Sequence, residues 1–185
     1  MKFLRFFFII FISLTSSVKA DFNKKLLNQL EDGGKLIFIR HAYAPGSGDP
    51  SNFNLKDCST QRNLSEEGRN QAHYIGEFFR NNKIKIHKVL SSEWCRCKET
   101  AQIAFKNFST NSFLNSFYSS KYAKNKDIQV NALKNYIKKF ESDKNLILVT
   151  HYVLISEVLN YGPSSGEIVV SDKNFNIMGS IEINY

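Results

Sequence analysis

Two histidines and two arginines stand at points in the sequence where side chains can perform phosphoryl chemistry. Arg40 and His41 end one short apolar run, His151 ends a second, and Arg96 follows a Ser-Ser pair that precedes a predicted helix. A guanidinium group offers phosphate oxygens a planar fork of donors and stays charged at any working pH. A neutral imidazole nitrogen can attack phosphorus. These residue types therefore predict a site for a tetrahedral dianion.

Strands of a parallel sheet are expected to position this set. The apolar runs at 36–39 and 146–149 are short, continuous and contain β-branched side chains, which is typical of buried parallel strands. Ligands bind beyond the carboxyl ends of such strands, so the Arg-His pair and the second histidine are expected at one sheet edge. A further strand is predicted at 87–90. Arg96 then falls in the first turn of the next helix, where orphan backbone N–H groups favour a phosphate oxygen.

Helices are predicted between the strands, because apolar side chains recur there every three or four residues. Ser65 is the predicted N-cap of one helix and has two glutamates behind it in the positive first turn. Two C-terminal strands with a polar four-residue connection favour an antiparallel hairpin. The expected fold is α/β, with a mostly parallel sheet and helices on both faces. Helices are predicted at 21–30, 65–81, 93 onward, 130–140 and 153–159, and the hairpin strands at 166–170 and 175–183.

A long polar loop is predicted at 42–63, directly after the Arg-His pair. Loops of this length inside a compact domain usually serve a site or are disordered. The Gly-Ser-Gly segment at 46–48 is interpreted as a turn, because it does not open a helix. Residues 106–127 show little periodicity, and no element is predicted there.

The first 20 residues have the pattern of a secretory signal peptide. A basic start, an apolar run at 6–14 and small residues before Ala20 follow one another. The apolar run is shorter than the roughly 20 residues that span a bilayer, which disfavours the alternative of an uncleaved anchor. We expect cleavage after Ala20, leaving one domain at 21–185 that is periplasmic or secreted and has no stable membrane anchor.

The net charge and the positions of the basic residues favour a small anionic partner. The formal net charge is +8, and it falls to +5 when Lys2, Arg5 and Lys19 leave with the signal peptide. The remaining lysines are scattered and form no basic stripe interleaved with aromatic side chains, so nucleic acid is not an expected partner. Arginines at strand and helix ends favour a small phosphorylated substrate. Because they neutralise its charge, no metal or other cofactor is required.

Three cysteines fit an exported protein with one disulfide and one odd thiol. Cys95 and Cys97 are too close in the chain to be the expected pair, so Cys58 is expected to pair with one of them. Such a bond ties the long loop to the helix start that carries Arg96. Zinc is the competing interpretation, but a second ligand pair at zinc spacing is missing. Export and the odd thiol count disfavour a thiol enzyme.

Four sequence fragments, in this order, resemble the histidine phosphatase superfamily: IRHA at 39–42, LSEEGRNQA at 64–72, SSEWCRCKETA at 91–101 and VTH at 149–151. The resemblance covers about residues 35–160 and implies the three-layer phosphoglycerate mutase-like fold. It assigns the role of nucleophile to His41. It assigns phosphate-pocket roles to Arg40, Arg96 and His151.

The sequence departs from the family pattern at two points. Ala42 replaces the glycine of the usual Arg-His-Gly triplet. The acid that mutase-type members carry between the second arginine and the second histidine has no clear equivalent here. Asp57 and Glu167 are the favoured candidates for a proton donor, and Arg62 is a candidate substrate contact. Further carboxylates considered are Asp49, Asp127, Glu141 and Asp143. Phosphoramidates and other good leaving groups need little protonation, so a dedicated acid is not obligatory.

The leading hypothesis is an exported phosphatase that hydrolyses a phosphomonoester or phosphoramidate through a phosphohistidine on His41. Phosphoglycerate mutase-type transfer is the first alternative, disfavoured by export and by the short segment before His151. A phospholigand-binding envelope protein without catalysis is the second, because a fold does not imply an activity. The short members that the chain resembles include phosphohistidine-protein phosphatases and sugar-phosphate phosphatases, and the sequence does not choose between these substrates.

Overall fold

The computed structural model describes residues 24–184. The signal peptide predicted for residues 1–20 lies outside the described residues. Within the described part of the chain, no helix is both long and apolar enough to cross a membrane.

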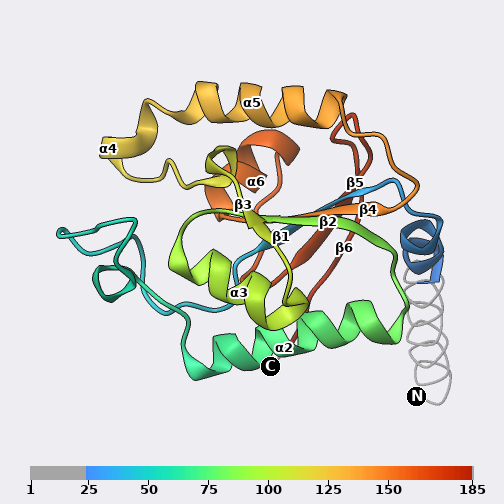
Figure 1. Cartoon of the computed structure of the whole chain (residues 1–185), viewed down its shortest axis with the longest axis horizontal. Helices are drawn as coiled ribbons and strands as arrows, with labels where there is room; N and C mark the ends of the chain where they lie inside the picture. Colours follow the sequence, from blue (N-terminus) through green and yellow to red (C-terminus); the bar gives the residue numbers. More distant parts are fainter. Residues whose placement is uncertain (1–23, 185) are drawn as a thin grey trace, which may run out of the picture.

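Six strands form one mixed sheet in the order β3-β2-β4-β1-β5-β6 (Figure 1). The β1–β4, β4–β2 and β2–β3 pairs are parallel, whereas β1–β5 and β5–β6 are antiparallel. The central strand β1 is therefore paired on both sides. The strands are β1 (Leu36–Arg40), β2 (Ile86–Ser91), β3 (Ser109–Thr110), β4 (Asn145–Thr150), β5 (Ile168–Ser171) and β6 (Ile177–Ile181).

Helices cover both faces of the sheet and make the fold a three-layer α/β structure (Figure 1). Successive side chains of a strand point to opposite faces. Ile37 and Ile39 accordingly pack with residues of α2, α3 and the helical segment 24–32. Leu36 and Phe38 pack on the other face with residues of α5 and α6. These helices are α2 (Glu66–Asn81), α3 (Cys95–Phe105), α5 (Lys126–Lys138) and α6 (Tyr152–Leu159).

Most predicted elements are confirmed, and the exceptions lie near the second arginine. The C-terminal strands form the predicted antiparallel hairpin, and Ser65 caps α2 by accepting from the N–H of Gly68. The start predicted for α3 at Glu93 is wrong, because the helix begins at Cys95 and its N-cap is Trp94, without a side-chain cap. The segment without a prediction contains β3, the 3₁₀ turn η2 (Ser112–Leu114) and the short helix α4 (Ser120–Ala123).

The loop between β1 and α2, residues 41–65, is called the first loop. It is held against α2 by a close backbone approach. A Cβ on Gly68 would lie 1.9 Å from the carbonyl oxygen of Tyr43, so only glycine allows this contact. Gln71, one turn further, accepts from the N–H of Tyr43 and donates to the carbonyls of Ser165 and Ile183. One buried amide thus links the first loop, the loop after α6 and the C-terminal segment.

The strands β1 and β4 bring the two histidines together. Arg40 is the register partner of Thr150, and the N–H of His41 donates to the carbonyl of Thr150 at 2.9 Å. Because the strands are parallel, His41 and His151 both follow at the carboxyl edge of the sheet. The same edge holds the start of α3.

Candidate active site

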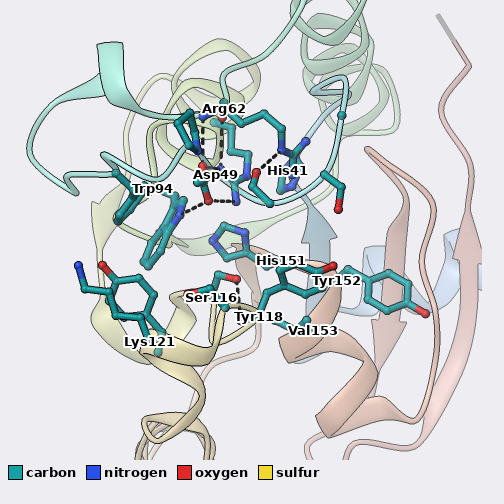
Figure 2. A pocket seen from close by; sticks show the side chains of 18 of the residues that line it. His41, Asp49, Arg62, Trp94, Ser116, Tyr118, Lys121, His151, Tyr152 and Val153 are labelled. Carbon is teal, nitrogen blue, oxygen red and sulfur yellow. Dashed lines mark hydrogen bonds and ion pairs between the residues drawn. The ribbon is translucent and has the colours of Figure 1, made fainter.

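A cavity of about 390 Å³ opens at this edge, and all four residues of the predicted phosphate site line it (Figure 2). Arg62 and Asp49 from the first loop line it as well, and aromatic and serine side chains complete the wall. Its remaining lining residues are Gly46, Ser47, Gly48, Pro50, Ser51, Phe53, Trp94, Ser116, Tyr118, Ser119, Lys121, Tyr122, Tyr152 and Val153.

His41 is buried and held as a neutral imidazole. Its side chain is 2% exposed, and Nδ1 lies 2.8 Å from the carbonyl oxygen of Ala42. A carbonyl only accepts hydrogen bonds, so Nδ1 carries the hydrogen and Nε2 keeps its lone pair. Burial, followed by the positive charge of Arg96, lowers the pKa of His41 well below its usual value. The ring is therefore neutral at neutral pH, with Nε2 available for attack.

His151 lies beside His41. Its ring is 3% exposed and meets the ring of His41 edge-on, with centroids 5.6 Å apart. Nε2 lies 2.9 Å from Oγ of Ser92. Burial, followed by the charge of Arg96, lowers the pKa of His151 well below its usual value. Two neutral imidazoles thus share a site otherwise dominated by arginines.

Two buried guanidinium N–H groups lack an acceptor within residues 24–184, and they belong to Arg40 and Arg96. Arg40 donates from Nη1 to the carbonyl of Pro163 at 2.8 Å and lies over the ring of Tyr152, but its Nε is unpaired. Nε of Arg96 is unpaired in the same way. An unsatisfied buried donor is costly, and charged donors cost most. Both groups fit a site that receives an anion.

Asp49 occupies the outer side of Arg96. Its carboxylate accepts from Nη1 of Arg96 at 2.7 Å and from Nη2 at 3.2 Å. Nε1 of Trp94 and the N–H of Arg62 donate to it as well (Figure 2). Burial raises the pKa of Asp49, but the hydrogen bonds and charge of Arg96 outweigh burial, and the net pKa is lowered. Asp49 is therefore ionised at neutral pH and is a poor proton donor.

Arg62, a predicted substrate contact, lines the cavity and also shapes the loop. Its Nε donates to the carbonyl of Gly48 at 2.8 Å, and Nη1 donates to the carbonyl of Ala44. These bonds fold the first loop back on itself. They hold Asp49 in reach of Arg96.

The two favoured acid candidates lie elsewhere. Glu167 does not line the cavity, because the hydroxyl of Tyr161 and the N–H of Ser164 hold its carboxylate at 2.6 and 2.7 Å. Asp57 is exposed and caps the 3₁₀ turn η1 (Cys58–Thr60) by accepting from Ser59. Both residues were candidates because they are close to site residues in the sequence. In the structure, each carboxylate accepts hydrogen bonds from residues close to it in the chain. Within the described residues, Asp49 is the carboxylate that lines the cavity.

Sequence reasoning assigned no site role to Ser92 or to Trp94. Ser92 directly precedes the helix start predicted at Glu93, but the helix begins at Cys95 and the Ser92 hydroxyl contacts His151 instead. Trp94 stacks on Phe53 with ring centroids 5.1 Å apart and meets His151 edge-on. Its place two residues before Arg96 indicates a partly enclosed environment from the sequence alone, and in the structure Trp94 lines the cavity.

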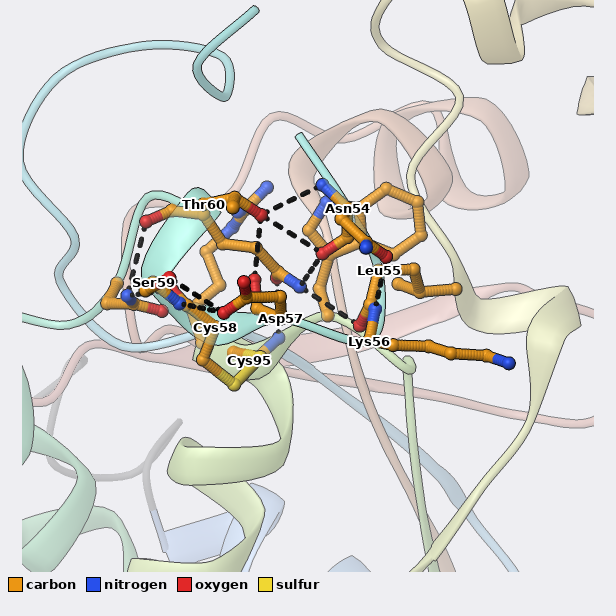
Figure 3. The surroundings of a disulfide bond; sticks show 12 residues. Asn54, Leu55, Lys56, Asp57, Cys58, Ser59, Thr60 and Cys95 are labelled. Carbon is orange, nitrogen blue, oxygen red and sulfur yellow. Dashed lines mark hydrogen bonds between the residues drawn. A yellow bond between two sulfur atoms is a disulfide. The ribbon is translucent and has the colours of Figure 1, made fainter. Parts of the chain in front are cut away.

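A disulfide joins Cys58 in η1 to Cys95, the first residue of α3 (Figure 3). It fastens the far end of the first loop beside Arg96. Cys97 is free and buried, and burial raises its pKa to about 12. A thiol with that pKa is not a thiolate at neutral pH, which counts against nucleophilic catalysis by Cys97.

The two buried histidines make stability depend on pH. Their folded pKa values lie below the unfolded value of 6.5, so the unfolded chain binds more protons below that pH. The contribution of the two histidines to the free energy of unfolding is fully present above pH 6.5. It is lost as the pH falls from there towards the pKa values of the folded state. Each histidine contributes a slope of up to about 1.4 kcal/mol per pH unit. The pKa of Asp49 is lowered from 3.8, so protonation of Asp49 reduces the free energy of unfolding only at more acidic pH.

Urea unfolding between pH 7.5 and 5.5 measures this slope. We expect His151→Gln to remove about half of it, since each histidine contributes equally at most. His73→Ala serves as the control, because His73 is exposed and forms a surface ion pair with Glu77. A free energy of unfolding that stays flat over this range contradicts the prediction.

Comparison with known proteins agrees with this geometry. A model of the histidine phosphatase superfamily (branch 1) matches residues 36–113. Curated protein sequences give no match. Among solved structures, the protein histidine phosphatase SixA complexed with tungstate is 14% identical, with a TM-score of 0.52 over 77% of this chain and 92% of that one.

Two further solved structures share the fold. Phosphoglycerate mutase from Thermus thermophilus is 13% identical, with a TM-score of 0.58 over 81% of this chain and 99% of that one. The mycobacterial glucosyl-3-phosphoglycerate phosphatase in complex with VO3 is 14% identical, with a TM-score of 0.52 over 75% and 92%. The family match contains His41, Arg40 and Arg96 but ends before His151. Residues 36–113 of the chain therefore match the histidine phosphatase superfamily, and the solved structures show that the chain has the same fold as members of that kind.

Proposed function

We propose that the protein is a phosphatase that hydrolyses a phosphomonoester or phosphoramidate through a phosphohistidine on His41. One observation carries the proposal. His41, whose Nε2 keeps a lone pair, lines a cavity together with Arg40 and Arg96, and the buried Nε–H groups of both arginines have no acceptor among the described residues. A nucleophile next to unsatisfied cationic donors suits a reaction that passes through a charged phosphoryl group.

The reaction has two balanced steps. In the first, Nε2 of His41 forms a bond to phosphorus while the bond to the leaving oxygen or nitrogen breaks, and the leaving group departs with the electron pair and gains a proton. In the second, water attacks phosphorus, the P–N bond returns its electrons to Nε2, and phosphate is released. Arg40 and Arg96 stabilise the charge on the phosphoryl oxygens in both steps. This charge neutralisation supports a route that needs no metal ion.

The site favours leaving groups that need little protonation. The one carboxylate among the described lining residues is Asp49, and its lowered pKa keeps it ionised. A phosphoramidate such as phosphohistidine loses a ring nitrogen more easily than an alkyl ester loses an alkoxide. The similarity to a protein histidine phosphatase agrees with this choice. We therefore propose phosphohistidine-like and activated esters ahead of simple alkyl esters.

Export remains part of the proposal. The Cys58–Cys95 disulfide supports it, because such bonds persist in oxidising compartments. N-terminal sequencing of the protein from a periplasmic fraction is expected to begin at Asp21. A chain that retains Met1 in the cytosolic fraction contradicts export.

A phosphoenzyme trap tests the activity. Brief incubation with a radiolabelled phosphoramidate, followed by alkaline quenching, is expected to leave a base-stable and acid-labile label on His41. His41→Ala is expected to lose the label and all turnover. His73→Ala is the matched control and should label fully, because His73 lies on the exposed side of α2.

The same assay separates the alternatives. A labelled His41→Ala protein contradicts the proposed nucleophile. Tight binding of inorganic phosphate without label or turnover indicates a phospholigand-binding protein. Transfer of the label to a phosphoglycerate in preference to water indicates a mutase.

A further inference from the structure

Three polar residues behind the cavity form a continuous hydrogen-bonded chain that ends on His151. Oγ of Ser92 lies 2.9 Å from Nε2 of His151 and 3.1 Å from Oδ1 of Asn115. Nδ2 of Asn115 donates to the carboxylate of Glu93 at 2.6 Å. Among these residues, His151 and Ser92 are buried, and the chain runs between β2, η2 and β4.

Glu93 fixes the orientation of the Asn115 amide at both of its ends. The Glu93 carboxylate only accepts hydrogen bonds, so it must face the NH₂ group of Asn115. The backbone N–H of Glu93 only donates, and it lies 2.9 Å from Oδ1 of Asn115. Rotating the amide by half a turn would place like groups against each other at both contacts. Oδ1 therefore faces Ser92.

This orientation determines where the proton of His151 resides. Because Oδ1 of Asn115 accepts, the hydroxyl of Ser92 must donate to it, and the backbone N–H of Trp94 also donates to Ser92. Oγ of Ser92 is then left to accept from Nε2 of His151. The Cys97 thiol lies beside the same ring, with Sγ 3.5 Å from Nε2 and 4.0 Å from Nδ1, and its hydrogen can be donated to the carbonyl of Thr150 at 3.6 Å. The shorter contact of Nε2 is the 2.9 Å contact with Oγ of Ser92.

We propose that Glu93, Asn115 and Ser92 are positioning residues that keep the hydrogen of His151 on Nε2, so that Nδ1 handles the proton of the reaction. The two site histidines then have opposite tautomers, because His41 carries its hydrogen on Nδ1. The proposal rests on the proposed function and supplies the proton transfers that Asp49 cannot.

The proton balance is as follows. A substrate bound as its monoanion gives its phosphoryl proton to Nδ1 of His151, which becomes an imidazolium. The imidazolium passes this proton to the leaving oxygen or nitrogen as the bond to phosphorus breaks. In the second step, Nδ1 takes a proton from the attacking water as the P–N bond at His41 breaks. That proton then leaves to solvent, and Ser92 accepts from Nε2 throughout.

Ring-nitrogen NMR of the ¹⁵N-labelled protein without substrate tests the tautomer directly, with His151→Gln used for assignment. We expect His151 in the Nε2–H form and His41 in the Nδ1–H form. Ser92→Ala should give His151 a mixture of tautomers, whereas Ser92→Thr, which keeps the hydroxyl, should preserve the Nε2–H form. An Nδ1–H tautomer of His151 in the unmodified protein overturns the proposal.

Kinetics give the second readout. Ser92→Ala is expected to lower kcat by about tenfold or more while KM changes little, because general acid–base catalysis contributes on the order of 10²–10⁴. Ser171→Ala is the control, since Ser171 is equally buried but lies on β5 opposite Leu36, at the other end of β1. An unchanged kcat in Ser92→Ala contradicts the proposed positioning of His151 by Ser92. A failed phosphoenzyme trap with the expected tautomers refutes the phosphatase and leaves the positioning chain standing.

Discussion

Arg96→Ala is expected to lower kcat/KM by about a thousandfold, because loss of one preorganised donor to a transition-state oxygen commonly costs 10²–10³ and here a whole cation is lost. Arg96 is 3% exposed, its Nε has no acceptor among the described residues, and it lines the cavity together with both histidines. Arg96→Lys keeps the charge but loses the planar fork, and we expect it to recover only a small part of the rate. Steady-state kinetics with an aryl phosphate measures both variants.

Stability separates the chemical role of Arg96 from its structural one. In Arg96→Ala the Asp49 carboxylate, 16% exposed, loses its cationic partner, which should destabilise the fold by about 3 kcal/mol. Arg96→Ala/Asp49→Ala should regain part of this stability but none of the activity. Arg69→Ala is the control, because the Arg69–Glu99 pair is exposed and contributes less than about 1 kcal/mol. Recovered activity in the double variant would mean that Arg96 serves only to neutralise Asp49.

Removing the disulfide is expected to have the second largest effect. The bond closes a loop of 37 residues between Cys58 and Cys95, which corresponds to about 4 kcal/mol of loop-closure entropy in the unfolded chain. Cys58→Ser/Cys95→Ser should therefore lower Tm by about 8–15 °C. We also expect KM to rise more than kcat falls, because Asp49 and Arg62 lie on the released loop.

Reductant provides the control for this experiment. The unmodified protein treated with a dithiol should reproduce the Tm of Cys58→Ser/Cys95→Ser, and the variant should not respond to the dithiol. Thermal unfolding of both proteins, with and without reductant, measures the effect. Equal Tm values in all four samples would show that the loop is held by its other contacts alone.

The strands and the core of the site were predictable because their signals are local. Apolar runs that end in Arg40-His41 and in His151 identify two strands, and parallel pairing then brings their ends together. The position of Arg96 in the first turn of α3 follows from the same logic. The sequence does not decide whether Cys58 pairs with Cys95 or with Cys97. Only the orientation of α3 decides this, because it turns Cys95 towards η1 and Cys97 towards His151.

The proton donor was not predictable, because irregular segments position every carboxylate concerned. Glu167 and Asp57 lie near site residues in the sequence, yet both carboxylates accept hydrogen bonds within local turns and do not line the cavity. Asp49 reaches Arg96 only because Arg62 folds the first loop back through carbonyls that no residue pattern identifies. The helix start predicted at Glu93 was wrong for a similar reason. Ser92 is bound by Asn115 and His151, and this tertiary contact outweighs its capping preference.

The central place of β1 has a consequence for motion. Its backbone is bonded to β4 on one side and to β5 on the other, whereas the first loop contains one 3₁₀ turn and many exposed residues. Amide hydrogens of β1 and β4 should therefore exchange with solvent only in global unfolding, and those of the loop through small local openings. His41 directly follows the strand that is expected to exchange most slowly, so local openings of the loop that carries Asp49 would let product leave without moving His41.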